Sequence, residues 1–496
     1  MLLQQFPDPV RFAELARNAN VIPVCIEVLA DTETPVSLLG KFYRNQPPVF
    51  LFESVEGGER WGRYSFLGIS ARAEIRIFRD EVVVWENHSE ERIPHDGAPF
   101  AVLKRHMHRY RPADLPGLPR FWGGLVGYLT YESVAFIESI PHGWPVEKAL
   151  AHFVVPDAMI VFDNVRHTLM AIGLAFTENG KPPETLYRET VERVENLLET
   201  VENPTTPPRV STPFTSSLKP VQPPEAFQAS VRRVKDHIYE GDVIQTVISQ
   251  SFACDTLPDL WSLYRAQRYV NPSPYLFFLH LGGTALVGSS PETMIRLENG
   301  TATLRPIAGT RPRGKTEQED RRLASELLAD EKEKAEHLML VDLGRNDLGR
   351  VAEIGTVQVT DLMVVERYSH VMHLVSNINC DLRDGADAWD LLAATFPAGT
   401  LTGAPKVRAM EIISELETDP RGAYGGAVGY IAFNGNMDMA ITIRTACAED
   451  GRLIVRAGAG IVADSDPESE QMETVNKARA IERALQLLQV DRKEKP

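Results

Sequence analysis

Two hydrophobic periods alternate along the chain. Before residue 200, short apolar or alternating stretches read as strands, with a further stretch interrupted by glycines: 21–30, 47–55, 73–78, 81–86 and 121–132. From residue 225 the period changes, because Phe227, Val231, Val234 and Ile238 fall on one face of a helix that ends at Gly241. A strand pattern follows at once, and helices and strands then alternate to the end, so the pattern predicts a mixed α and β protein.

A proline-rich segment divides these two parts. Residues 203–224 contain seven prolines among Thr, Ser and Val, which disfavours both helix and sheet hydrogen bonds. We therefore predict an N-terminal domain at 1–203, a linker at 204–224 and a second domain at 225–490.

Composition narrows the classes of function. The 496 residues are 43% hydrophobic and 24% charged, which is typical of a globular protein. A net charge of −16 opposes broad binding to nucleic acid or to an anionic membrane. The four cysteines have no metal-ligand spacing, and no stretch is apolar enough for a membrane span or an export signal, so we expect a cytoplasmic protein.

Two pairs of glutamates have a spacing that suits a hard cation. Glu333 and Glu336 lie three residues apart in a helix predicted to run through Met339, and Glu470 and Glu473 follow a helix start at 465–467. Lys477 shares the face of the second pair. Such pairs are usually solvated salt-bridge faces, but two facing pairs would supply the oxygen ligands that magnesium prefers.

Several other positions can be interpreted as either structural or functional. Gly458, Ala459 and Gly460 end an apolar strand, where their backbone either approaches an anion or only bends. Arg444 is predicted within an apolar strand, where it needs either a buried protein carboxylate or an anionic ligand. His373 is either a hydrogen-bonded core histidine or a catalyst.

Ten motifs in the second part, read together, identify a family. In order they are GDVIQTVISQ, NPSPYLFFLH, GSSPE, PIAGTRPRG, AEHLMLVDLGRNDLGRV, ERYSHVMHLVSNI, FPAGTLTGAPKVRAMEII, GGAVGYI, ITIRT and AGAGIVADSDPESEQMET. The chain resembles the chorismate-utilising enzymes, and among them the large subunit of anthranilate synthases. The resemblance implies an α/β (α+β) fold in which two large antiparallel sheets pack together and helices surround them.

The resemblance also implies roles for residues. Glu336 and Glu473 match direct Mg²⁺ ligands, with Glu333 and Glu470 reaching the ion through water. The positions that match substrate contacts are Gly309, Thr310, Tyr424, Arg444, Gly458, Ala459 and Gly460, and Lys477 is a further candidate. Glu292 matches a general acid for the leaving 4-hydroxyl, His373 a histidine needed for pyruvate elimination, and Thr400 lies in a matching active-site loop.

Two positions distinguish this chain from other members of the family and favour anthranilate formation. Gln245 stands where isochorismate and salicylate synthases carry a lysine that activates water. Ala308 stands where many aminodeoxychorismate synthases carry a nucleophilic lysine. The implied reaction converts chorismate and ammonia to anthranilate and pyruvate, the first committed step of tryptophan biosynthesis.

The first part adds a regulatory resemblance. Ser54, in an LFES motif, matches a tryptophan-binding residue for feedback inhibition, and Pro274, Tyr275 and Leu276 match the other wall of that pocket. No glutaminase nucleophile motif is visible, so a separate glutaminase subunit, in a heterotetramer, would supply ammonia from glutamine. Two alternatives remain: component I of an aminodeoxychorismate synthase, and a catalytically silent tryptophan-binding regulator.

Overall fold

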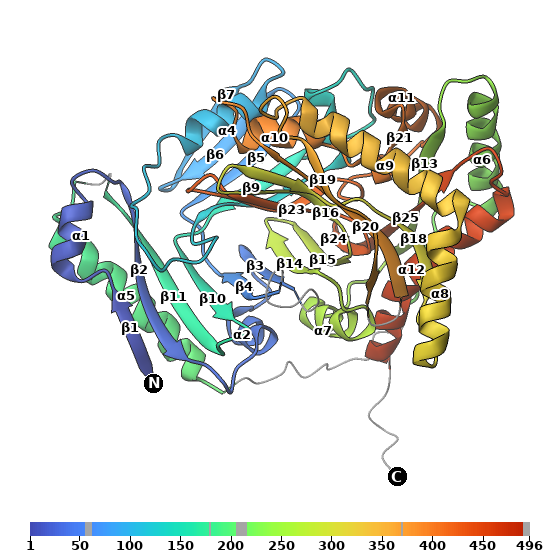
Figure 1. The fold of residues 1–496 in the computed structure, drawn as a ribbon. Coiled ribbons are helices and arrows are strands. Elements are labelled where there is room, and N and C mark those ends of the chain that lie inside the picture. The colour runs from blue at the N-terminus through green and yellow to red at the C-terminus, as the bar shows by residue number, and fades with distance from the viewer. Residues whose placement is uncertain (55–61, 178–179, 205–215, 369–370, 490–496) are drawn as a thin grey trace, which may run out of the picture.

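Two large antiparallel sheets pack face to face, with helices around them (Figure 1). The computed structural model describes residues 1–54, 62–177, 180–204, 216–368 and 371–489. Within these residues one sheet has 13 strands and the other 12.

The first sheet contains strands from both sides of the proline-rich segment. In spatial order it comprises β1 (Leu2–Phe6), β2 (Val21–Leu29), β11 (Thr168–Phe176), β10 (Ala158–Asp163), β4 (Tyr64–Gly68), β3 (Val49–Glu53), β14 (Tyr275–Leu281), β15 (Thr284–Ser290), β24 (Thr445–Glu449), β25 (Arg452–Ile461), β13 (Gln245–Cys254) and β12 (Lys219–Pro220), with β21 (Gly403–Ala404) paired to β13. The join between the two parts is the antiparallel pair β3 and β14, where Glu53 lies opposite Leu276.

The second sheet is also shared. Its order is β18 (Ile307–Pro312), β20 (Val371–Asp381), β17 (Thr301–Leu304), β16 (Thr293–Glu298), β23 (Met437–Ile441), β22 (Ala427–Ala432), β8 (Gly124–Leu129), β9 (Ala151–Val155), β5 (Ala73–Ile77), β6 (Glu81–Glu86) and β7 (Ser89–Pro94), with β19 (Gln358–Arg367) paired to β20. The chain leaves this sheet after Ile441 and enters the first sheet at Thr445, so residues 442–444 cross between the two.

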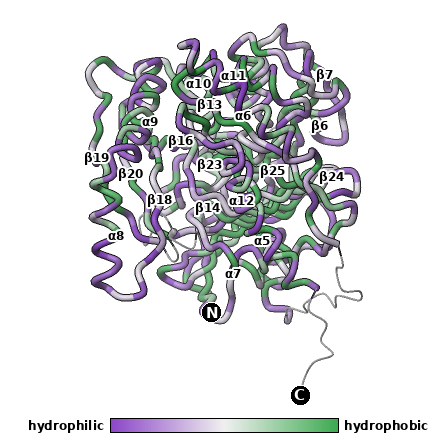
Figure 2. Tube along the Cα trace, turned by 90° about the vertical axis from the view of Figure 1, so that its right-hand side faces the viewer, coloured by the Kyte–Doolittle hydropathy of each residue, from purple (hydrophilic) through white to green (hydrophobic). Residues whose placement is uncertain are grey.

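Helices cover the outer faces and the ends of the sheets. They are α1 (Pro9–Leu15), α2 (Pro35–Phe42), α4 (Pro99–Met107), α5 (Pro183–Glu202), α6 (Pro224–Tyr239), α7 (Leu260–Val270), α8 (Glu317–Ala329), α9 (Glu331–Gly349), α10 (Ala388–Thr395), α11 (Lys406–Leu416) and α12 (Pro467–Gln489), with short 3-10 turns η1 (Tyr131–Phe136) and η3 (Gly399–Leu401). Hydrophobic segments concentrate in the strands, whereas α8 at the edge is largely hydrophilic (Figure 2).

Strand β14 shows why the core has two layers. Phe277 and Leu279 point into the apolar cluster between the sheets, and Leu276 and Phe278 point into the cluster under α2, α7 and α12. Because successive strand residues face opposite sides, a strand buried on both faces needs apolar residues at successive positions, as in 276–279 of this strand.

The strands predicted before residue 200 and the helix predicted from residue 225 agree with the structure, whereas one later helix differs in length. The predicted strands are β2, β3, β5, β6 and β8, and α6 buries Phe227, Val231 and Val234 before Gly241, whose φ is 84°. Helix α9 continues ten residues beyond the predicted end at Met339, to Gly349. The domain boundaries remain a prediction, since both sheets draw strands from both parts and 205–215 lies outside the described residues.

Candidate active site

A cavity of about 620 Å³ lies where α9 and α12 meet the ends of both sheets. Its lining includes all but one of the residues that the sequence assigned to catalysis, substrate or metal: Glu292, Gly309, Thr310, Glu333, Glu336, His373, Thr400, Tyr424, Arg444, Gly458, Gly460, Glu470, Glu473 and Lys477. These positions span almost 190 residues of sequence, so the fold, and not local spacing, brings them together.

The two glutamate pairs face this cavity from two helices. Glu333 and Glu336 lie on α9, which begins with Asp330 as its N-cap, and Glu470 and Glu473 lie on α12. Burial is the main cause that raises the pKa of Glu336, and the carboxylates of Glu333 and Glu473 raise it further. Burial likewise raises the pKa of Glu470.

This donor set fits a hard divalent cation. It offers carboxylate oxygens without nitrogen or sulfur ligands, and anionic groups crowded in a partly buried place are stabilised by a cation. Glu333 is held by Arg311 (3.0 Å) and Glu473 by Lys477 (2.7 Å). Among the described residues, no three of the four glutamates bring their oxygens within 4.8 Å of one another, so the ion would have to draw the two helices' carboxylates together.

Glu292 has the environment of a proton donor. It follows β15 and is 8% exposed. Burial raises the pKa of Glu292 to about 8, although the nearby Thr400 and the charge of Lys477 oppose the rise. At neutral pH its carboxyl group therefore keeps its proton.

His373, on β20, is positioned by the neighbouring edge strand β18. Its Nδ1 lies 3.2 Å from the Gly309 carbonyl oxygen and 3.0 Å from the Thr310 hydroxyl. A proton on Nδ1, donated to the carbonyl, leaves Nε2 as the basic nitrogen. Burial lowers the pKa of His373, so the ring is neutral near pH 7.

Arg444 lies outside the strands, which corrects the prediction that placed it within one. It is the last residue of the crossover between β23 and β24, and its φ of 50° breaks the extended conformation. Among the described residues, no carboxylate lies within salt-bridge distance of its guanidinium, and burial lowers its pKa. Of the two readings of this arginine, the geometry favours an anionic ligand.

The end of β25 forms another wall. Gly458 and Gly460 face the cavity, whereas the Ala459 side chain is fully buried on the opposite face with α6 and α11. A Cβ at Gly458 would lie 2.5 Å from the Tyr424 hydroxyl, so only glycine fits there. Lys477 donates to the Gly458 carbonyl (2.8 Å), which ties α12 to this wall.

Gln245 and Arg456 also line the cavity, although the sequence assigned neither of them to catalysis, substrate or metal. Gln245 donates to the Glu336 carboxylate (3.2 Å), and its own Oε1 has no hydrogen-bond partner among the described residues. Arg456 on β25 is bound by Glu417 (3.0 Å), which also holds Arg421 (2.7 Å), in a buried ionic network behind the cavity. The sequence feature that could have identified Arg456 is an arginine within an apolar strand pattern. The same feature had drawn attention to Arg444.

A second, smaller cavity of about 50 Å³ lies at the join between the two parts of the chain. Ser54, directly after β3, and Pro274, Tyr275 and Leu276, at the start of β14, line it together, and their role in binding tryptophan stays a prediction. The Tyr275 hydroxyl donates to Asp438 (2.8 Å), and Glu53 on its rim is buried with its pKa raised by burial.

Comparison with known proteins gives the family. A model for chorismate binding enzymes matches residues 48–483. The chain belongs to the chorismate-binding enzyme family. It is 47% identical to anthranilate synthase component 1 of Pseudomonas putida, covering 94% of this chain and 96% of that one, and 45% identical to the Aquifex aeolicus protein of the same name, covering 97% and 98%.

Solved structures agree with the fold of this chorismate-binding enzyme. Anthranilate synthase component I from Streptococcus pneumoniae superposes with a TM-score of 0.76 at 35% identity, over 92% of this chain and 99% of that one. The menaquinone-specific isochorismate synthase of Escherichia coli, at 18% identity and a TM-score of 0.71, shares the fold. The predicted family and fold class are therefore confirmed.

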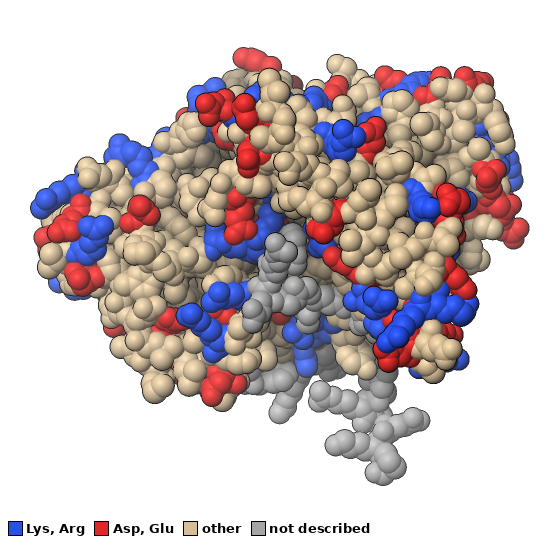
Figure 3. Space-filling view, viewed as in Figure 1, with Lys and Arg blue, Asp and Glu red and all other residues tan. Residues whose placement is uncertain are grey.

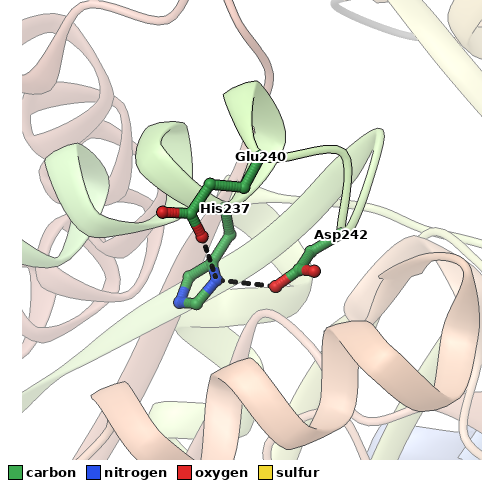
Figure 4. Close-up of side chains that lie close together, drawn as sticks. All are labelled: His237, Glu240 and Asp242. Atoms are coloured by element: carbon green, nitrogen blue, oxygen red, sulfur yellow. Dashed lines mark hydrogen bonds and ion pairs between the residues drawn. The ribbon is translucent and has the colours of Figure 1, made fainter.

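A separate cluster of one histidine and two carboxylates lies outside the active-site cavity. Figure 4 shows the carboxylates of Glu240 and Asp242 pointing toward Nδ1 of His237, at 3.9 and 2.9 Å. Asp242 also accepts from Arg408 (2.7 Å), which already supplies a cation. We infer that these side chains have a structural role and stabilise the turn after α6.

Positive and negative side chains are interspersed over the face in Figure 3. Among the helices of the described residues, none combines the length and the apolar character that a bilayer crossing requires. All four cysteines, each within the described residues, are free.

Proposed function

We propose that this chain is the synthase component of an anthranilate synthase, a cytoplasmic enzyme that converts chorismate and ammonia to anthranilate and pyruvate. One observation carries the proposal: two glutamate pairs, a buried carboxyl group, an oriented histidine and an arginine that has no carboxylate partner among the described residues line one cavity. The family membership and the names of the similar proteins support it.

The charged groups suit the two carboxylates of chorismate. Arg444 is the cation for the enolpyruvyl carboxylate, because its planar guanidinium can bind a carboxylate through two parallel hydrogen bonds. Glu336 and Glu473, with Glu333 and Glu470 behind them, would hold Mg²⁺. When bound, this ion supplies positive charge for the ring carboxylate.

Glu292 and His373 divide the proton transfers. Ammonia forms a bond to ring carbon 2, and the 4-hydroxyl leaves as water with the proton that Glu292 holds. In the second stage the proton on carbon 2 is removed and pyruvate is released, the stage to which the resemblance assigns His373. Its basic Nε2, fixed by the hydrogen bonds of Nδ1, suits that stage.

Two side chains that line the cavity bear on the identity of the nucleophile. Gln245 and Ala308 are both there, and neither can act as an amine base or form a covalent intermediate. Ammonia therefore has to enter the cavity, and we propose that a separate glutaminase subunit delivers it from glutamine, in a heterotetramer. Tryptophan, bound between Ser54 and Pro274, Tyr275 and Leu276, would inhibit the enzyme.

The proposal is tested with the purified chain, chorismate, Mg²⁺ and ammonium salt at about pH 8.5, where more ammonia is in its nucleophilic neutral form. We expect anthranilate fluorescence that EDTA abolishes and that tryptophan suppresses, and no turnover with glutamine in place of ammonium. An aminated product that keeps its pyruvyl group would instead identify an aminodeoxychorismate synthase. Tryptophan binding without any turnover would identify a silent regulator.

A further inference from the structure

The backbone of Arg444 is held in a rarely occupied conformation. Its φ of 50° lies in the left-handed region, which residues other than Gly, Asn and Asp seldom adopt. Such a conformation persists only where surrounding contacts fix it. What fixes it here decides where the guanidinium can reach.

Two donors converge on the Arg444 carbonyl oxygen. The side-chain Nε2 of Gln267 donates at 2.7 Å, and the backbone N–H of Ser289, at the end of β15, donates at 3.2 Å. The Gln267 bond is the shorter of the two. It comes from α7, a helix on the outer face of the first sheet, and Gln267 itself does not line the substrate cavity.

The surroundings of Gln267 indicate that its amide is present for this bond. The side chain is 2% exposed, between the buried apolar residues Leu263 and Tyr264 of the same helix face. Its Oε1 has no hydrogen-bond partner among the described residues. Burying an amide oxygen without a partner is costly, so an apolar side chain would be preferred here unless the donor were needed.

We propose that Gln267 is a positioning residue for chorismate: it fixes the left-handed backbone of Arg444 and so aims the guanidinium into the cavity. The inference rests on the proposed function, because it takes Arg444 as the contact for a substrate carboxylate. Without the Gln267 donor the carbonyl loses its stronger partner. Residue 444 can then relax toward an extended conformation that turns its side chain away from the cavity.

The test measures chorismate binding to the full chain with Mg²⁺ and without ammonia, together with steady-state kinetics. Gln267→Met keeps the length and apolar packing of the side chain but removes the donor. We expect the dissociation constant and KM to rise about tenfold, as for the loss of one buried hydrogen bond, while kcat changes little. Gln267→Leu, which also removes the donor, should act in the same direction and serves if the Met variant does not fold.

Asn20→Leu is the matched control. Asn20 is a buried amide whose Nδ2 also donates to a backbone carbonyl, that of Arg109 (2.6 Å), in the N-terminal part of the chain. Its replacement removes this bond and the one that Oδ1 accepts from the Arg111 N–H (2.5 Å), so it should cost at least as much stability as Gln267→Met and leave chorismate affinity unchanged.

A double-mutant cycle with Arg444→Met separates positioning from general destabilisation. If Gln267 acts through Arg444, adding Gln267→Met to Arg444→Met weakens chorismate binding no further. An equal loss in both backgrounds, or normal affinity in Gln267→Met, would overturn the inference while leaving the proposed function intact. Failure of the unaltered chain to bind chorismate would instead overturn the proposed function, and the inference with it.

Discussion

Replacing Glu292 by Gln should make the protein less active and more stable. Glutamine keeps the size of the side chain and its ability to donate a hydrogen bond, but it cannot transfer a proton. General acid catalysis typically contributes about 10² to 10⁴ in rate, so kcat with ammonia should fall by a factor in that range.

The stability gain follows from the buried carboxyl group. An acid whose pKa is raised on folding binds its proton more tightly in the folded state, so its ionisation lowers the free energy of unfolding. This cost is absent below the pKa of the unfolded state and grows until the pH reaches the pKa of the folded state. For Glu292 these values are 4.5 and about 8. At pH 7 the cost is about 1.4 kcal/mol for each pH unit above 4.5, or about 3 kcal/mol, and the neutral amide of the Glu292→Gln variant would avoid it.

The assay compares urea unfolding at pH 5, 7 and 9 with anthranilate formation for the native chain and Glu292→Gln. The stabilisation should be small at pH 5 and larger at pH 7 and 9. For the native chain, kcat/KM calculated on free ammonia should decline as the pH rises through about 8, as Glu292 loses its proton. Glu132→Gln is the control, since burial raises the pKa of Glu132 to about 7 outside the cavity, and its activity should not fall a hundredfold. A Glu292→Gln variant that stays active and is no more stable than the native chain would show that Glu292 is neither the proton donor nor a destabilising buried acid.

Three further changes test other parts of the molecule. Glu336→Gln should raise the Mg²⁺ concentration needed for half-maximal activity by at least about tenfold, because one carboxylate ligand is lost; an unchanged requirement would remove Glu336 from the metal site. Ser54→Phe should fill the second cavity and abolish tryptophan inhibition while ammonia-dependent turnover persists, and retained inhibition would place the inhibitor elsewhere. Arg421→Met should destabilise the fold by about 3 to 5 kcal/mol in urea unfolding, because it leaves Glu417 with one cation fewer in a buried network, and a loss under about 1 kcal/mol would contradict that account.

The sequence predicted the strands and helices that carry strong local signals. Alternating and apolar runs define β2, β5 and β6, and the cap residue Asp466 and Pro467 mark the start of α12, where Asp466 accepts from the Ser469 N–H (2.9 Å). The cavity residues were predicted through the family motifs, since no local pattern joins Glu292 to Arg444.

Contacts between distant segments were not predictable from periodicity. The pair β3 and β14 merges the two parts of the chain into one sheet, although a proline-rich segment separates them. Helix α9, which is longer than predicted, continues through Gly344, where a Cβ would lie 2.8 Å from the Ile378 side chain of β20. The glycine there serves a close approach and does not end the helix.

The crossover at Arg444 was missed for a related reason. Its apolar neighbours favour a strand, and a positive φ at arginine has no signal in the local sequence. The hydrogen bonds that reach its carbonyl come from Gln267 and Ser289, which lie on other elements.

The central claim is tested most directly by the products of the isolated chain. Chorismate, Mg²⁺ and ammonium salt are incubated with the purified protein, and anthranilate and pyruvate are quantified separately by mass spectrometry and a coupled reduction assay. We expect equal amounts of anthranilate and pyruvate, and we expect their formation to require both Mg²⁺ and ammonium. Isochorismate formed from water, or an aminated product without released pyruvate, would contradict it.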